Sequence, residues 1–156
     1  MAMDGGEKTG VVTALVRSSF LVNAAYAEAG RECGLTPQQG QLLCALMPQP
    51  YGMSELGALL GLARSSLTGL VDRTMRRGLV RREPDPRDGR AVRVALTDEG
   101  AALAEDFRAA TCRRIEELSA GLGAAERATL AELLGRLLQE NAGRDNAGRA
   151  ANRNSS

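Results

Sequence analysis

The chain has 156 residues, 44% of them apolar, with a net charge of +1, three cysteines and no histidine. That length allows one domain with a moderate core, or a small domain joined to an association element. Without histidine, a G-x-x-x-x-G-K phosphate loop or cysteines at metal-ligand spacing, the sequence argues against an enzyme and predicts neither a metal site nor a cofactor.

The first predicted element is a long helix from Thr9 to about Cys33. Its apolar residues occupy more than one face: Val11, Val12, Leu15, Val16, Phe20, Leu21, Val22, Ala25, Tyr26 and Ala29. A small domain cannot bury a helix that is apolar over so much of its circumference. We therefore predict that this helix forms a subunit interface.

A second helix is predicted from Thr36 to about Met47. Thr36 supplies a capping hydroxyl, and Pro37 occupies the first turn, where its missing N–H is not needed. Residues 48–52 contain two prolines and a glycine, which predicts a turn.

Two helical patterns separated by Gly61 follow. The first spans Ser54–Leu60, with the Ser54 hydroxyl as its predicted cap. The second spans Arg64–Arg77, and Gly78 would end it in the left-handed conformation. Its inward stripe consists of Leu67, Leu70 and Val71, spaced at i, i+3 and i+4.

Two short runs, Leu79–Glu83 and Ala91–Leu96, are candidate strands. Residues 84–90 between them are rich in turn-forming and charged residues. Two helices joined by a turn and followed by a two-stranded hairpin form the pattern of a winged helix-turn-helix, in which the hairpin is the wing.

Residues 64–93 carry nine arginines and four acidic residues, a local net charge of +5 in a chain of +1. A basic footprint on a near-neutral protein indicates a phosphate-facing surface. Ser65, Ser66 and Thr68 add to this, because small hydroxyl residues let a helix approach base edges closely. These features favour double-stranded DNA as a partner, although arginines on a polar face are also ordinary solvated charge.

Thr97 caps another predicted helix, which runs to about Ala120 with two acids in its first turn. A last helix, Ala124–Asn141, carries a leucine stripe typical of helix–helix packing: Leu130, Leu133, Leu134, Leu137 and Leu138. We predict that the helices at both ends of the chain form an all-helical dimerisation layer, which makes the protein a homodimer.

From Ala142 to Ser156 the composition shifts to Gly, Asn, Arg and Ser with no apolar period, which predicts a disordered tail. No apolar run reaches the ~20 residues of a membrane span. The first ten residues also lack the pattern of a secretory signal. We expect a cytoplasmic protein with no membrane partner.

The chain resembles the multiple-antibiotic-resistance-regulator (MarR) family of bacterial winged-helix transcription factors. The resemblance covers roughly residues 9–141 and follows an ordered set of segments: LTPQQ at 35–39, SELGALLGLARSSLTGLVDR at 54–73, RGLVRR at 77–82, DPRDGRA at 85–91 and LTDEG at 96–100. It departs at Gly69, where many members carry an arginine or another long side chain on the recognition helix, so the operator sequence stays open. It also departs at Thr74, where a leucine commonly packs, which predicts looser packing behind that helix.

Pattern and resemblance together predict a mainly α fold with a small β-hairpin wing. The winged helix-turn-helix is expected at about 36–96, within a domain of residues 9–141. The dimerisation helices are expected at about 9–33 and 97–141, and the tail at 142–156.

We expect DNA contacts from the recognition helix, Arg64–Arg77, and from the wing. The expected contact residues are Arg64, Ser65, Ser66, Thr68, Gly69, Arg73, Arg76, Arg87, Gly89 and Arg90. Asp88 is expected to be a structural residue of the wing that pairs with Arg73 or Arg90. Arg90, at the tip, could then enter a minor groove.

The resemblance also implies a pocket where the dimer layer meets the winged domain, often filled by an anionic aromatic compound. Arg17 is the one charged residue in the apolar run 11–22, and its guanidinium could pair with a carboxylate at two points. The alternative is that Arg17 extends to solvent or pairs across the interface. Phe20 and Tyr26 could line such a pocket, or belong to the core.

The thiols suggest a different switch, since some relatives of the family sense peroxides through a thiolate. Cys33 ends its helix, where the dipole opposes a thiolate, and Cys44 lies among leucines as a small core residue. Cys112 lies beside Arg113 and Arg114.

The sequence thus predicts a ligand-responsive homodimeric transcriptional regulator that binds a pseudo-palindromic operator. We expect it to act as a repressor. The alternatives are a thiol-based redox-sensing regulator of the same fold, and a winged-helix module that contacts proteins and not DNA.

Overall fold

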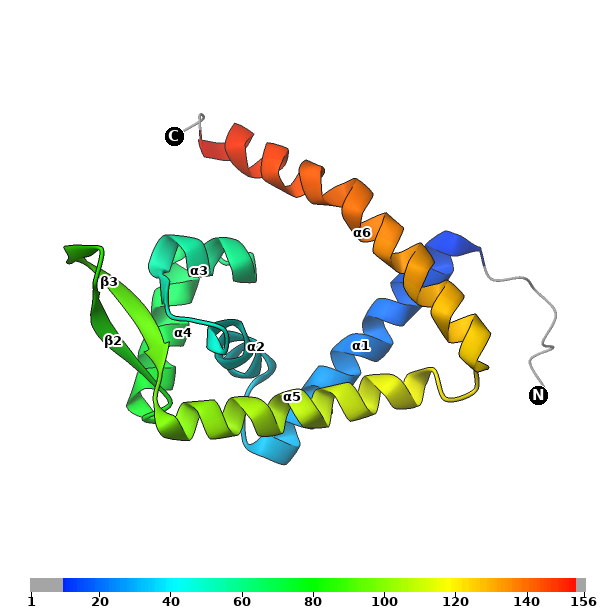
Figure 1. Ribbon diagram of the computed structural model, residues 1–156, viewed down its shortest axis with the longest axis horizontal. Coiled ribbons are helices and arrows are strands. Elements are labelled where there is room, and N and C mark those ends of the chain that lie inside the picture. Colours follow the sequence, from blue (N-terminus) through cyan, green and yellow to red (C-terminus); the bar gives the residue numbers. More distant parts are fainter. Residues whose placement is uncertain (1–9, 154–156) are drawn as a thin grey trace. The chain divides into compact units, whose positions relative to one another are not determined.

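The computed structural model describes the backbone of residues 10–153 and the side chains of residues 10–142. Its elements are α1 (Val11–Cys33), α2 (Pro37–Leu46), β1 (Tyr51–Gly52), α3 (Met53–Leu60), α4 (Arg64–Arg76), β2 (Val80–Asp85), β3 (Asp88–Leu96), α5 (Asp98–Leu118) and α6 (Ala124–Arg153) (Figure 1). The chain divides into two compact units, the first ending at Glu116 and the second, which contains α6, beginning at Glu117. Many helices and one small sheet confirm the predicted fold class.

β2 and β3 form the wing, an antiparallel hairpin in which Val80 pairs with Leu96 and Pro84 with Val92. The strands are longer than predicted, and only residues 86 and 87 form the turn. Because β2 lies at the sheet edge, Pro84 fits there without removing an interior ladder bond.

β1 pairs with the other side of β3, so the strand order is β1-β3-β2. The sequence predicted only a turn at this place. A two-residue strand is too short to show any alternation of apolar and polar residues, so no periodic signal marked it.

Local capping explains where α2 begins and where α4 ends. Thr36 and Gln39 form a capping box at α2, with the Thr36 hydroxyl accepting from the Gln39 N–H at 3.1 Å. Gly78 follows α4 with a φ of 73°, so the predicted left-handed end is confirmed. The predicted Ser54 cap was wrong: α3 begins one residue earlier, at Met53, because the chain enters it directly from β1 through Gly52.

Thr97 joins the wing, α4 and α5. Its hydroxyl donates to the Gly78 carbonyl at 2.6 Å and accepts from the Gly100 N–H at 3.0 Å. At Gly100 a Cβ would lie 1.8 Å from the Leu79 carbonyl oxygen, so the start of α5 packs directly on the backbone after α4. Thr97 therefore caps α5, as predicted, and also fixes it to the end of α4.

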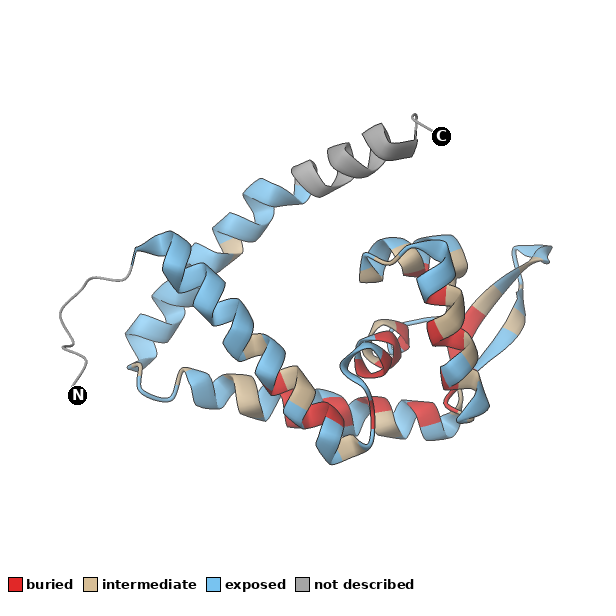
Figure 2. Cartoon of the chain, turned by 180° about the vertical axis from the view of Figure 1, so that it is seen from behind, coloured by how far each residue is buried: buried red, intermediate tan, exposed pale blue. Residues whose placement is uncertain are grey.

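The core of the first unit gathers residues of α2, α3, α4, the sheet and α5 (Figure 2). Its fully buried large side chains are Leu42, Leu43, Leu56, Leu67, Leu70, Val71, Thr74, Val94 and Phe107. Phe107 of α5 packs on Gly40 of α2, where a Cβ would lie 2.3 Å from the ring. The Tyr26 ring of α1 lies 6.0 Å from that of Phe107, so the end of α1 joins the same core.

The first half of α1 is exposed in the single chain, as the pale blue ribbon in Figure 2 shows. Phe20, for example, has 65% of its surface exposed, whereas Ala25 and Ala29 further along are buried. α1 begins at Val11, and Thr9, its predicted start, lies outside the described residues.

α6 continues to Arg153, past its predicted end at Asn141. The backbone of residues 142–153 is therefore helical where the sequence predicted a disordered tail. Alanine and arginine favour helix, and each residue added to an existing helix adds one hydrogen bond, so no apolar period is needed. Residues 154–156 lie outside the described part. Within that part, no helix is both long enough and apolar enough to cross a membrane.

Candidate nucleic-acid interface

α4, the predicted recognition helix, is anchored by its inner side. The predicted stripe of Leu67, Leu70 and Val71 is buried. Thr74 is fully buried as well, and its hydroxyl donates to the Leu70 carbonyl at 2.7 Å. The hydroxyl of Thr74 therefore has a hydrogen-bond partner within the helix. Because these four residues face the core, the opposite side of α4 faces outward.

The outer face of α4 carries all the recognition-helix residues that the sequence singled out. Arg64, Ser65, Ser66, Arg73 and Arg76 are exposed, and Thr68 and Gly69 are half-buried. The Thr68 hydroxyl donates to the Arg64 carbonyl at 2.8 Å, so its oxygen can still accept a hydrogen bond. The helix therefore presents hydroxyls and guanidinium groups side by side.

The wing tip carries Arg87, Gly89 and Arg90, all exposed. Two aspartates shape this tip by accepting backbone hydrogen bonds. The Asp85 carboxylate accepts from the Arg87 N–H at 2.9 Å, and that of Asp88 accepts from the Arg90 N–H at 3.1 Å. The expected side-chain pair of Asp88 with Arg73 or Arg90 is not among the ion pairs of the described residues. A short aspartate side chain reaches its own turn backbone more easily than a distant guanidinium.

Four of the nine arginines between residues 64 and 93 form side-chain hydrogen bonds or ion pairs with other residues of the chain. Arg77 donates to the Gln39 amide oxygen at 3.1 Å, and Arg82 to Asp72 at 2.8 Å. Arg81 and Arg93 both pair with Glu83, at 3.2 and 2.6 Å. The Arg93 hydrogen bond is the main reason that the pKa of the Glu83 carboxyl lies below its usual value.

The other five have no side-chain hydrogen bond or ion pair to another described residue: Arg64, Arg73, Arg76, Arg87 and Arg90. All five belong to the predicted DNA contacts. Intramolecular pairing therefore separates the arginines that hold the winged domain together from those whose guanidinium donors are available to a partner.

Arg82 braces the wing against α4. Besides its bond to Asp72, its guanidinium contacts the Met75 sulfur at 3.3 Å. Sequence reasoning missed this contact, because ten residues and a change from helix to strand separate Arg82 from Asp72. No local spacing rule links such a pair.

Arg17, Phe20 and Tyr26, the predicted ligand residues, do not converge within one chain. Arg17 and Phe20 are exposed, whereas Tyr26 is half-buried beside Phe107. Nine residues of helix turn Arg17 and Tyr26 to opposite sides of α1. A hollow of about 420 Å³ lies elsewhere in this unit and is lined by Glu32, Cys33, Leu103, Asp106, Ala109, Ala110 and Arg113.

Comparison with known proteins bears on this arrangement. The family model described as MarR family matches residues 34–91, a range that contains all ten predicted DNA-contact residues. The HTH-type transcriptional repressor NicR of Pseudomonas putida is 41% identical over 113 residues, which cover 70% of this chain and 71% of NicR. The chain belongs to the MarR family.

Solved MarR-family structures agree in fold. Wild-type MarR of Escherichia coli without ligand superposes with a TM-score of 0.75 at 29% identity, covering 85% of this chain and 99% of that one. BpsR of Bordetella bronchiseptica, described with a mechanism for regulation of its DNA binding by 6-hydroxynicotinic acid, gives a TM-score of 0.69 at 26% identity, covering 88% and 97%. Membership of the MarR family identifies the chain as a DNA-binding transcriptional regulator.

Proposed function

We propose that this MarR-family protein is a homodimeric repressor that binds a pseudo-palindromic operator and releases it when a small anionic aromatic compound binds. The observation that carries the proposal is the set of five arginines without an intramolecular partner in the described chain, three on α4 and two at the wing tip. Charges kept free of internal acids are available for phosphates and base edges.

In this proposal α4 enters the major groove. Ser65, Ser66 and Thr68 are small enough for a close approach, and Gly69 leaves the centre of the face open. Arg64 and Arg76 lie near the two ends of the helix, where the groove walls bring the phosphates. They contribute affinity more than sequence preference.

The wing tip reaches the adjacent minor groove. Arg87 and Arg90 project from a turn whose backbone is held by Asp85 and Asp88, and Gly89 adds no side chain. A narrow A·T-rich minor groove attracts arginine by its enhanced negative potential. Arg90 is therefore the residue that reads groove shape, and Asp88 acts on DNA only through the turn that it holds.

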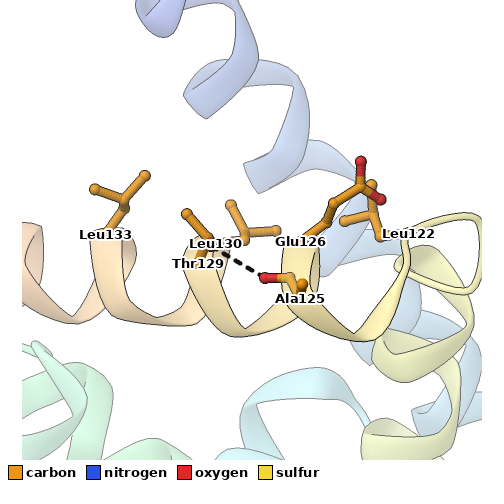
Figure 3. A pocket seen from close by; sticks show the side chains of 6 residues that line it. All are labelled: Leu122, Ala125, Glu126, Thr129, Leu130 and Leu133. Carbon is orange, nitrogen blue, oxygen red and sulfur yellow. Dashed lines mark hydrogen bonds between the residues drawn. The ribbon is translucent and has the colours of Figure 1, made fainter.

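Exposed apolar surface on the helices at both ends of the chain supports the homodimer. On α1 it consists of Val11, Val12, Leu15, Val16, Phe20 and Leu21, and on α6 of Leu130, Leu133, Leu134, Leu137 and Leu138. A hollow of about 450 Å³ lies along the start of α6. Figure 3 shows Leu130 and Leu133 of α6 on the same side of the helix as Leu122, which precedes it. A soluble monomer rarely leaves so many large apolar side chains in water, so a second copy is the simplest cover for each surface.

A relative supports the proposed class of effector. BpsR responds to 6-hydroxynicotinic acid, a carboxylated aromatic ring. Arg17 is exposed on the apolar half of α1. In a dimer, apolar side chains would surround it and strengthen its hydrogen bonds to a ligand carboxylate. A ligand that prefers one spacing of the two recognition helices lowers DNA affinity by its differential affinity for the two states.

The decisive experiment is selection of bound fragments from a random duplex library by the purified full-length protein, with light scattering on the same sample. We expect two inverted half-sites, a scattering mass twice that of the chain, and affinity that falls steeply with salt. Absence of salt-dependent DNA binding would favour the protein-contact alternative. A well-folded monomer at micromolar concentration would refute the assignment of the α1 and α6 surfaces.

A further inference from the structure

Gly69 occupies the middle of the exposed face of α4 without any need for glycine in its backbone. Its φ is not among the positive values of the described glycines, which are Gly34, Gly61 and Gly78. Glycine inside a helix destabilises the helix relative to alanine. The residue must therefore contribute something other than backbone freedom.

The space that Gly69 leaves is used by Arg73, one turn further along the helix. A Cβ built on Gly69 would lie 3.1 Å from Nη1 of Arg73 and within 4 Å of no other atom. Side chains on a helix lean toward its N-terminus, so residue 73 covers the surface at residue 69. The end of the Arg73 guanidinium thus lies over the glycine, on the face that carries Ser65 and Thr68.

The guanidinium of Arg73 is also free of a competing carboxylate. The acid nearest in sequence, Asp72, accepts from Arg82 of the wing at 2.8 Å. Among the residues whose side chains are described, no hydrogen bond or ion pair engages Arg73. Its planar fork of N–H donors therefore remains complete for a partner outside the chain.

We propose that Arg73, lying over Gly69, is a base-reading residue that recognises a guanine in each operator half-site, and that Gly69 determines specificity by leaving this position open. The inference rests on the proposed function and adds to it the identity of one recognised base. An arginine fork matches the O6 and N7 acceptors of guanine, a pattern that no other base pair offers in the major groove. Lysine carries the same charge but lacks that planar geometry.

The first test repeats the fragment selection with Arg73→Ala and Arg73→Lys. We expect wild type to select guanine at one symmetric pair of positions, and both variants to lose that preference. Affinity for the wild-type operator should fall roughly 5- to 150-fold for each half-site in Arg73→Ala, the range for one lost bidentate contact. Affinity for a scrambled duplex should change far less.

Arg76→Ala is the matched comparison, because Arg76 is an exposed arginine on the same helix with the same net charge change. We expect it to weaken operator and scrambled duplexes by similar factors, as loss of a phosphate contact does. If Arg73→Ala behaves in the same uniform way, Arg73 is a phosphate contact and the inference is wrong, while the proposed function stands. If wild type selects no DNA at all, the proposed function itself fails.

The second test addresses Gly69 through a double-mutant cycle. In Gly69→Ala the new methyl group forces the guanidinium to shift by a few tenths of an ångström, so the guanine preference should weaken. In the Arg73→Ala background the same substitution should leave base preference unchanged, because nothing remains to displace. Equal effects of Gly69→Ala in both backgrounds would overturn the role given to the glycine. The melting temperature of each variant serves as the control for folding. We expect Gly69→Ala to melt at or above the wild-type temperature, because alanine stabilises a helix relative to glycine.

Discussion

The guanidinium of Arg82, on β2, donates to the carboxylate of Asp72, on α4, over 2.8 Å. Because one partner lies in the wing and the other in α4, this pair holds the wing and α4 in one relative orientation. Both side chains are more than a third exposed, so solvent screens the pair and its contribution to stability is small.

Arg82→Ala should therefore affect DNA binding more than folding. We expect the free energy of unfolding in urea to change by less than about 1 kcal/mol, while operator affinity falls because the wing loses its fixed position. Asp72→Ala should act in the same direction, and the double variant should add little to either. Additive losses in the double variant would mean that the two residues act separately.

Arg90→Ala should weaken all DNA sequences by similar factors and reduce the log–log salt slope by about one unit for each protomer bound. The reason is that a minor-groove arginine reads shape and phosphate more than base identity. A bulky side chain in place of Ser65 or Thr68 should instead harm the operator far more than random DNA, by about 1–3 kcal/mol per lost base contact. Titrations with operator and scrambled duplexes at several salt concentrations measure both. A loss confined to the operator, with an unchanged salt slope, would make the wing a base reader.

Glu32 ties the end of α1 to α5 through two arginines. Its carboxylate accepts from Arg114 at 2.8 Å and from Arg113 at 3.0 Å, and these hydrogen bonds hold the pKa of Glu32 below its usual value. A carboxyl with a lowered pKa in the folded state contributes stability above its unfolded pKa, about 4.3, and loses that contribution as pH falls through the lowered value.

Glu32→Gln should consequently lower the melting temperature at neutral pH, and the difference from wild type should shrink as the solution is acidified below about pH 4. Glu28→Gln is the control, since among the described residues Glu28 pairs with Arg31 within α1 and with no residue of a second element. A difference between Glu32→Gln and wild type that persisted undiminished in acid would contradict the ion-pair explanation.

The thiols of Cys33 and Cys44 should not act as an oxidant switch. Burial raises the pKa of the Cys44 thiol, and burial together with Glu32 and Asp106 raises that of Cys33. Both therefore carry little thiolate at neutral pH, and iodoacetamide should label the exposed Cys112 first. Cys33→Ser should leave operator binding and its response to mild peroxide unchanged. Release of DNA by oxidised wild type but not by Cys33→Ser would support the redox alternative.

Gly40→Ala should destabilise the first unit by about 1–3 kcal/mol, the usual cost of overpacking. The added Cβ would lie 2.3 Å from the buried ring of Phe107, which has no room to withdraw. Gly135→Ala, in α6 with no atom within 4 Å of the new carbon, is the matched helical control and should not destabilise the chain in the same urea titration. Similar losses in both variants would remove the role given to the ring.

The structural features that could be predicted from the sequence are those that depend on residues close to one another in the chain. The apolar stripe of α4, its end at Gly78 and the Thr36 cap each depend on spacings of three or four residues, and the structure confirms all three. The α4 positions among the predicted DNA contacts follow from the same period, since the inward stripe determines which residues of the helix face outward.

The errors arose where tertiary contacts decide the local structure. Ser54 has a good capping side chain, but pairing of β1 with β3 starts the helix at Met53. Asp88 bonds to its own turn and not to a distant arginine. Which arginines lack an internal partner depends on where Glu83 and Asp72 lie in three dimensions, and no periodicity in the sequence contains that information.

The hydrogen bonds of Thr97 couple a movement of α5 to a movement of α4. Its hydroxyl holds the first turn of α5 to the carbonyl that follows α4, so the two helices cannot pivot independently at this joint. The 21 residues of α5 give a length of about 30 Å. A tilt of roughly 5° about one end then displaces the other by about 3 Å, close to the ~3.4 Å rise of one base pair. A slight change in how the far end of α5 packs is thus enough to displace α4 by nearly one base-pair step.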